Sequence, residues 1–406
     1  MSIRQGRTIF VAGVLIAGVI SACGAPGSPA PAGSGGAAAG VPDKPAQPVT
    51  LNVLDVAGNL QLTQGMIDEF VQKNPTIISK VTYSKAPAPD LVGKIKAQQG
   101  AGRVDIGLVL TGVDGLAAGT EQGLWEQVLP KFKDRLSNMA NYQEPAAKMQ
   151  ALAGDFGVTV TYYPSGPLIE YMPSKVANPP KTAEELLAYA KAHPGKVEYA
   201  RPANSGPGRT LLMGLPYILG DKDPKDPVNG WAKTWAYLGE LNKYINNYPS
   251  GTTPTMKDLA NGTANIVAST TGWDINPRVL GTVPETAKVG TLQGFHWVTD
   301  AHYAVIPKGA SADQQAAVLK LVQFMLTKEQ QAKAFDDGYF YPGPAVKDVD
   351  ISMAPQKSQD AIKTFGRADY DQLIANNPKE TPLDAKSVVA AFDKWDREIG
   401  GAKVAK

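Results

Sequence analysis

The stretch "LNVLDVAGNLQLTQGMIDEFVQKNPTIISKVTYSKAPAPDLVGKIKAQQGAGRVDIGLVL", Leu51 to Leu110, decides the fold. Short apolar runs typical of buried strands alternate in it with apolar residues at helical spacing, such as Met66, Ile67 and Phe70. The resulting order is strand, helix, strand, helix, strand. Because consecutive parallel strands need crossover helices, this order predicts a parallel sheet flanked by helices, and therefore an α/β protein.

The same alternation returns toward the C-terminus and predicts a second α/β unit. Strands are expected at 196–202, 265–270 and 302–307. Capping-box motifs predict the starts of two helices, one at Thr182 with Glu185 and one at Ser311 with Gln314.

The N-terminus has the pattern of an export signal. Arg4 and Arg7 precede an apolar run over 8–19, and "ISAC", residues 20–23, resembles the bacterial lipobox. This pattern predicts a lipoprotein signal peptide over 1–22 and lipidation, including palmitate, at Cys23, the single cysteine of the chain. The alternative is an ordinary secretory signal that leaves Cys23 as a free thiol.

The segment that follows, 23–48, consists mainly of Gly, Ala, Pro and Ser. It lacks the bulky apolar side chains that offset ordering entropy, so we expect a flexible tether with the folded body beginning at Val49. Lipidation of Cys23 would leave no thiol, and therefore no disulfide, cysteine nucleophile or thiolate metal site.

Charge excludes one class of partner. Without Arg4 and Arg7 the chain has 38 basic and 38 acidic residues, and it contains no run of Lys or Arg. A nucleic-acid partner would need a basic face, so none is expected. No apolar run outside the signal reaches the roughly 20 residues of a membrane span, and we expect a monomer that is soluble apart from its anchor.

Five sequence segments, which follow one another in the same order as in the family, resemble the type II extracellular solute-binding proteins of ABC importers. This family includes binders of maltodextrin, ferric ion, thiamine and polyamines. The segments are "NPTIISKVTYS", "PDLVGKIKAQQGAGRVDIGLVL", "PSKVANPPKTAEELLAYAKA", "DLANGTANIVASTTGWD" and "HYAVIPKGASADQQAAVLKLVQFMLTKEQQAKAF". The resemblance implies a periplasmic-binding-protein-like type II fold, with two lobes of mostly parallel sheet joined by hinge strands. It places lobe 1 at 49–158 and 300–340, and lobe 2 at 159–299 and 341–406.

In such sheets ligands bind beyond the carboxyl ends of strands, and five loops qualify. Gly58 and Asn59 follow the first strand, where Gly58 either lets backbone approach a ligand or only turns the chain. Thr111, with Asp114 nearby, follows the third strand and either contacts ligand or caps the next helix.

The third and fourth loops belong to the second unit. Asn204 and Ser205 either cap a helix or hydrogen-bond a ligand. Trp273 would stack on a sugar, a heterocycle or an alkylamine, and Asp274 would pair with a cation, the alternative being that Trp273 is core.

The fifth loop, "GFHWVTDAHY", offers Trp297 and Asp300. Along a strand His296, Asp300 and His302 share one face, but they lie too far apart to bind one small ion together, so no metal site is expected. Periodicity does not say which face of the strand meets the ligand. Tyr341 is a further candidate. Tyr162 and Tyr163 superficially resemble the tyrosine pair of ferric-ion binders, but we expect Tyr162 to pack at the hinge.

The resemblance therefore implies a non-enzymatic, cofactor-free receptor, anchored outside the cytoplasm, that delivers a small solute to the permease subunits of an ABC importer. Acidic and aromatic residues permit a polyamine-like or other cationic solute, whereas the loop of Asn204 to Arg209 permits an anion. An exported hydrolase and a structural or adhesive lipoprotein are the alternatives. No Gly-x-Ser-x-Gly motif supports a hydrolase.

Overall fold

The computed structural model describes residues 40–56, 58–129 and 131–405, and those from Val41 onward form one compact unit. The predicted signal peptide, Cys23 and the tether as far as residue 39 lie outside the described residues.

A six-stranded sheet organises the first lobe. Its order is β10-β9-β3-β1-β2, with β4 also paired to β9. The strands β1, β2 and β3 are parallel, whereas β9 is antiparallel to β3 and β4. The strand bounds are β1 (Val49–Asp55), β2 (Ile78–Lys85), β3 (Leu108–Thr111), β4 (Gly157–Gly166), β9 (Trp297–Val305) and β10 (Lys379–Glu380).

A four-stranded sheet of order β6-β7-β5-β8 organises the second lobe. Its strands are β5 (Leu168–Tyr171), β6 (Val197–Glu198), β7 (Ile266–Ser269) and β8 (Lys288–Gly290). Only Pro167 separates β4 of the first sheet from β5 of the second, and the chain returns from β8 to β9. Strand β4 is therefore nearly continuous with the second sheet, whereas residues 291–296 separate β8 from β9. The predicted α/β fold class is confirmed.

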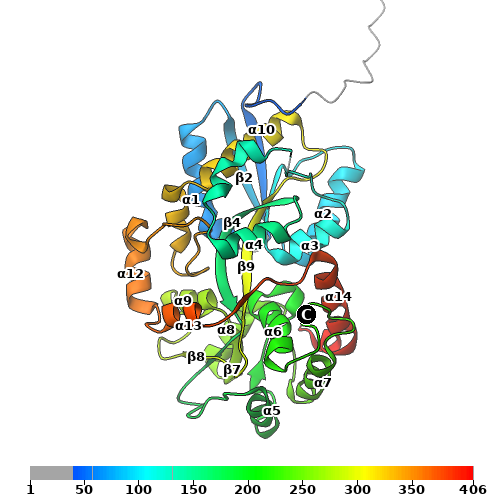
Figure 1. Ribbon diagram of the computed structural model, residues 1–406, viewed down its shortest axis with the longest axis vertical. Coiled ribbons are helices and arrows are strands. Elements are labelled where there is room, and N and C mark those ends of the chain that lie inside the picture. The colour runs from blue at the N-terminus through cyan, green and yellow to red at the C-terminus, as the bar shows by residue number, and fades with distance from the viewer. Residues whose placement is uncertain (1–39, 57, 130, 406) are drawn as a thin grey trace, which may run out of the picture. The chain divides into compact units, whose positions relative to one another are not determined.

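Helices surround both sheets (Figure 1). Those of lobe 1 are α1 (Leu60–Lys73), α2 (Ala88–Gly100), α3 (Val113–Glu121), α4 (Glu144–Leu152), α10 (Ala312–Met325) and α11 (Lys328–Gln331). Those of lobe 2 are α5 (Ala183–Ala192), α6 (Gly206–Ile218), α7 (Ala232–Leu241), α8 (Thr252–Asn261) and α9 (Thr271–Val279). The C-terminal helices are α12 (Gln356–Phe365), α13 (Tyr370–Asn376) and α14 (Ala385–Glu398). No helix within the described ranges has the length and apolar character needed to cross a membrane.

The C-terminal segment contacts both lobes, although the predicted ranges gave all of 341–406 to lobe 2. Helix α12 packs on α9, but β10 pairs with Trp297 and Val298 of β9 in the first sheet. Strand β3 pairs only with residues 303–305, the C-terminal end of β9, so β10 pairs with backbone groups at the N-terminal end of β9 that β3 does not reach. Helix α14 packs on α3, while its Trp395 donates a hydrogen bond to Tyr199, next to β6.

The last part of the predicted tether lies against lobe 1. The guanidinium of Arg135 donates to the carbonyl oxygens of Pro42 (2.7 Å) and Val41 (2.5 Å), and the Ala46 N–H donates to Asp313 (3.1 Å). Pro45 is buried. Residues 41–48 therefore run along lobe 1, held by Arg135, Asp313 and the buried Pro45, although most of their side chains remain exposed.

Candidate functional site

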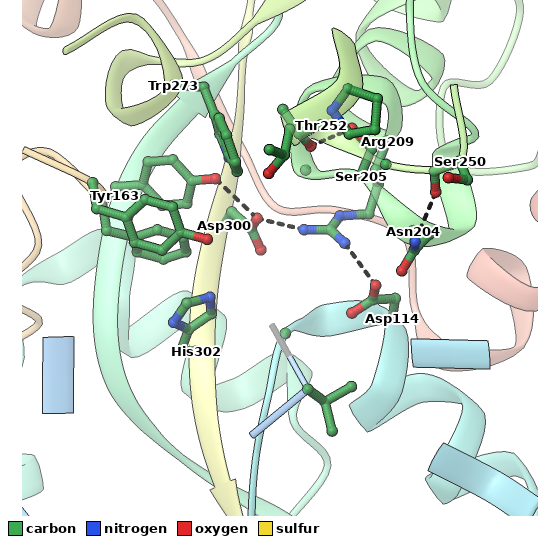
Figure 2. Close-up of a pocket in the computed structure, with 18 residues that line it drawn as sticks. Asp114, Tyr163, Asn204, Ser205, Arg209, Ser250, Thr252, Trp273, Asp300 and His302 are labelled. Atoms are coloured by element: carbon green, nitrogen blue, oxygen red, sulfur yellow. Dashed lines mark hydrogen bonds and ion pairs between the residues drawn. The ribbon is translucent and has the colours of Figure 1, made fainter. Parts of the chain in front are cut away.

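A cavity of about 380 Å³ is lined by residues of both lobes (Figure 2). Lobe 1 contributes Gly112 and Asp114 at the start of α3, together with Asp300 and His302 of β9. Lobe 2 contributes the loops before α6 and α8, and Trp273 of α9. The cavity thus lies where strands β3 and β7 end and helices begin, the position expected for ligands in α/β sheets.

Four helices begin at this cavity: α3, α6, α8 and α9. Ser205 caps α6 by accepting the Gly208 N–H (3.1 Å), and Thr270 caps α9 by accepting the Trp273 N–H (3.3 Å). The N-cap residues of α3 and α8 are glycines, Gly112 and Gly251, which offer no side-chain acceptor. At α3 the Gly115 N–H donates to Asp114 Oδ1 instead (2.9 Å), whereas the first-turn donors of α8 receive no acceptor from their N-cap residue. The dipoles of both helices favour negative charge at these starts.

Arg209 of α6 occupies the centre of the cavity, with only 5% of its surface exposed. One guanidinium nitrogen pairs with Asp300 Oδ2, and Nη1 lies 3.4 Å from Asp114 Oδ2 (Figure 2). Burial opposes the charge, but the two carboxylates outweigh it and raise the pKa of Arg209. Because α6 belongs to lobe 2 and α3 to lobe 1, this ion pair joins the two lobes across the cavity.

Asp300 and His302 sit side by side on the cavity face of β9, and both are 2% exposed. Asp300 Oδ2 also accepts the Tyr163 hydroxyl (3.2 Å), and Oδ1 accepts the Ala301 N–H (2.9 Å). Burial, followed by the nearby Arg209 charge, lowers the pKa of His302 to about 3, so its ring is neutral at physiological pH. Among the described residues, its Nδ1 has no hydrogen-bond partner.

Aromatic rings form one wall of the cavity. Trp273 meets Tyr339 edge to face with centroids 5.6 Å apart, and Phe340 lies against Tyr163 at 3.6 Å. Gly58 lies behind Tyr339: it has a φ of +72°, and a Cβ there would sit 2.5 Å from the Tyr339 hydroxyl oxygen. Glycine is therefore required at position 58 because a side chain there would displace the Tyr339 ring. Gly58 itself does not line the cavity.

Strand alternation on β9 decides which of the residues predicted there reach the cavity. Asp300 and His302 face it, whereas Trp297 points the other way, is fully buried and donates from Nε1 to the Leu373 carbonyl (3.1 Å). The predicted contact of Trp297 with ligand is therefore not part of this site, because residues at odd and even positions of a strand lie on opposite faces.

Asp274 is also separated from the cavity, although Trp273 beside it lines the wall. Its carboxylate is 0% exposed and accepts hydrogen bonds from Arg278 (2.9 Å), Arg367 (2.6 Å) and the Tyr370 hydroxyl (2.6 Å). Successive residues of a helix point about 100° apart, so Asp274 turns into the packing of α9 against the C-terminal segment. It has the role of a structural ion pair rather than the predicted partner of a cationic ligand.

Of the other predicted residues, Asn204 and Ser205 line the cavity, as do Trp273 and Asp300. Asn59 is the buried N-cap residue of α1, and its N–H donates to Asp55 (2.8 Å). Thr111 is buried, with its hydroxyl 3.3 Å from the Gly112 carbonyl, and does not cap α3. Tyr341 packs near Tyr370, 6.2 Å between centroids, outside the cavity lining.

Sequence reasoning missed the loop Ser250–Pro254, which lines the cavity at the start of α8. The run "SGTTP" before an amphipathic segment is a helix-start signal that would have found it. Asp114, Arg209 and His302 belonged to the right loops but were not selected, because their mutual contacts depend on tertiary structure. Within the described ranges, no three His, Cys, Asp or Glu side chains gather to hold a metal ion.

The chain matches the family model of bacterial extracellular solute-binding proteins over residues 65–364, and it belongs to this family. The protein YnjB of Escherichia coli K12 is 25% identical over 319 residues, which cover 73% of this chain and 76% of YnjB. Membership of this family makes the chain an extracellular solute-binding protein.

Solved structures agree on the fold. The spermidine/putrescine ABC transporter substrate-binding protein PotD of Streptococcus pneumoniae superposes with a TM-score of 0.56 at 14% identity, covering 85% of this chain and 99% of PotD. The periplasmic binding protein AfuA of Actinobacillus pleuropneumoniae, with bound fructose-6-phosphate, gives a TM-score of 0.59 at 16% identity over 86% of this chain and 98% of AfuA. At these identities the likeness concerns the fold alone, a two-lobe binding protein.

Proposed function

We propose that this chain captures a small solute in the cavity around Arg209 and delivers it to the permease subunits of an ABC importer. The observation that carries the proposal is that both lobes supply walls of one polar cavity, with the Arg209–Asp114 pair crossing between them. A solute that contacts both walls binds the closed arrangement more tightly than an open one. Ligand therefore shifts the population toward the closed form, which the permease would recognise.

We further propose that the receptor is a lipoprotein held at the membrane through Cys23. The lipobox-like "ISAC" ends at this residue, and the Gly/Ala/Pro-rich segment after it provides clearance before residues 41–48 reach the body. The mature protein would then face the extracytoplasmic side and act as a monomer.

Replacing Cys23 with Ser tests the anchor. The variant should fold and bind as the parent does but appear in the soluble fraction instead of the membrane fraction, because the acylated thiol is lost. Fractionation with a Ser21→Ala variant as a control checks this. Retention of Cys23→Ser at the membrane would contradict the anchor and leave solute capture intact.

Solute capture is tested by native mass spectrometry of the full chain, released from membranes in detergent, followed by thermal melting with the released compound. A receptor gains about 2.7 kcal/mol of stability when ligand exceeds Kd a hundredfold. A structural or adhesive lipoprotein gains nothing, and a hydrolase converts the compound. Absence of both a retained mass and a melting shift across a metabolite panel would overturn the proposal.

A further inference from the structure

We propose that the captured solute carries an oxyanion, a carboxylate or a phosphate group, bound beside Arg209 by the donors that His302 and the start of α8 direct into the cavity. This inference rests on the proposed capture function and names the substrate class of that same site. It follows from comparing which hydrogen-bonding groups of the cavity are already engaged and which are free.

The acceptors of the cavity are engaged. Its carboxylates belong to Asp114 and Asp300. The Asp300 oxygens accept from Arg209, Tyr163 and the Ala301 N–H. Asp114 Oδ1 accepts the Gly115 N–H (2.9 Å), and Oδ2 pairs with Arg209. All four carboxylate oxygens therefore already have a donor: Arg209 holds the two Oδ2 atoms, and backbone N–H groups hold the two Oδ1 atoms. An ammonium group would have to share carboxylates whose charge Arg209 already partly balances.

Donors, by contrast, accumulate at the wall from lobe 2. Helix α8 begins at Gly251 without a side-chain cap, so its first backbone N–H groups have no acceptor from that residue. Thr252 lies beside the start of α6, where its hydroxyl and that of Ser205 are 2.8 Å apart. Pro254 carries no N–H, which leaves the amides of Thr252 and Thr253 as the donors of this first turn.

His302 is the independent observation that points to a ligand. Its ring is 2% exposed, lines the cavity and directs its edge toward the space beside Asp300 (Figure 2). Among the described residues, its Nδ1 lacks a hydrogen-bond partner. A buried polar atom left without a partner is destabilising. A solute group placed here would remove that destabilisation, and the neutral ring offers one N–H donor to it.

The cavity volume of about 380 Å³ limits the solute to a small molecule. The aromatic wall of Trp273 and Tyr339 provides a surface for the remainder of that molecule. A polyamine would also fit such a wall. It would, however, need carboxylates that are not already paired, and the described residues of the cavity provide none.

The test is a charge series at Thr253, an exposed residue at the rim of the cavity in the first turn of α8. The full-length variants Thr253→Glu, Thr253→Gln and Thr253→Lys are compared by calorimetry with inorganic phosphate, glucose 6-phosphate, succinate and spermidine as probes. Thr263→Glu, just beyond the other end of α8, is the matched control, because it changes the net charge equally but lies far from the first turn.

For an oxyanion, affinity should rise from Glu through Gln to Lys by roughly threefold or more at each step, because added charge near the site acts directly on the bound anion. Thr263→Glu should bind as the parent does. The phosphate probes and succinate decide which oxyanion is preferred.

A reversed order, with spermidine as the probe that binds, would overturn the inference and leave solute capture standing. Binding of none of the four probes would also overturn it. In that case the mass retained by the parent protein in native mass spectrometry decides the proposed function separately.

Discussion

Neighbouring residues of this chain take opposite roles because backbone geometry separates them. Trp273 lines the cavity, whereas Asp274, one residue later on α9, is buried in a network with Arg278 and Arg367. Trp297 packs into the protein, whereas Asp300 faces the cavity from the same strand. The residue types alone did not distinguish these roles, since a buried Asp and a ligand-binding Asp look the same in sequence.

The two tryptophans provide a matched pair of substitutions. Trp273→Ala should weaken solute binding by about 1–3 kcal/mol with a small loss of stability, because the partly buried ring meets Tyr339 at the cavity. Trp297→Ala should lower the unfolding free energy by about 3–5 kcal/mol, because its ring is fully buried. Calorimetry and urea denaturation measure the two effects. A large loss of stability with unchanged affinity in Trp273→Ala would remove it from the site.

Glu170 on β5 should make stability depend on pH. Its side chain is fully buried, and within the described structure neither carboxylate oxygen has a hydrogen-bond partner. Burial and then repulsion by Asp274 raise its pKa to about 8, against the favourable charges of Arg278 and Arg367. Between about pH 4.3, where an unfolded Glu loses its proton, and pH 8, the folded protein holds the extra proton.

The unfolding free energy of the parent should therefore fall as pH rises through this window. Glu170→Gln removes the contribution, so the variant should gain stability over the parent by up to several kcal/mol between pH 5 and pH 8. Glu198, whose pKa is also raised to about 8, is present in both proteins and cancels in the comparison. Denaturation curves that differ by the same amount at both pH values would contradict the expectation.

At the scale of elements, local sequence signals gave the correct helix starts. Ser311 accepts the Gln314 N–H (3.2 Å), and the Gln314 side chain accepts the Ser311 N–H (3.1 Å), which completes the predicted capping box of α10. Thr182 accepts the Glu185 N–H (3.2 Å) at α5, but Glu185 turns to the Lys181 N–H (2.7 Å) instead of closing the box. Caps use contacts three or four residues apart, so local sequence suffices to find them.

Removal of the α10 cap should have a modest and specific cost. Ser311→Ala leaves the first-turn N–H of Gln314 without its acceptor and should lower the unfolding free energy by about 1 kcal/mol. Ser311→Asn, another good N-cap residue, should restore most of the loss. Chemical denaturation measures both, and equal losses in the two variants would show that the hydroxyl does not act as a cap.

At the scale of the whole folded body, the Arg209–Asp114 pair connects the two lobes. Asp114→Asn removes one charge from this pair, so we expect the closed arrangement to lose population and the radius of gyration of the ligand-free protein to increase in X-ray scattering. Glu121→Gln, at the exposed end of the same helix α3, removes an equal charge and should change nothing. Identical scattering of both variants would show that the pair does not control closure.

The sequence by itself determined the α/β class, the order β1-α1-β2-α2-β3 in lobe 1 and the starts of α5 and α10, whereas the start of α8 was missed. These properties depend on hydrophobic periodicity and on caps, which act over a few residues. Periodicity also placed Asp300 and Trp297 on opposite faces of one strand, but it did not say which face meets the cavity.

Only the tertiary structure decided the site itself. Arg209 meets Asp114 and Asp300 although they are 95 and 91 residues away in the chain. Likewise, β10 pairs with backbone groups of β9 in the first sheet, and Arg135 and Asp313 hold residues 41–48 against lobe 1. Such contacts depend on which surfaces the packed sheets bring together. Patterns over a few neighbouring residues do not predict contacts between residues so far apart in the chain.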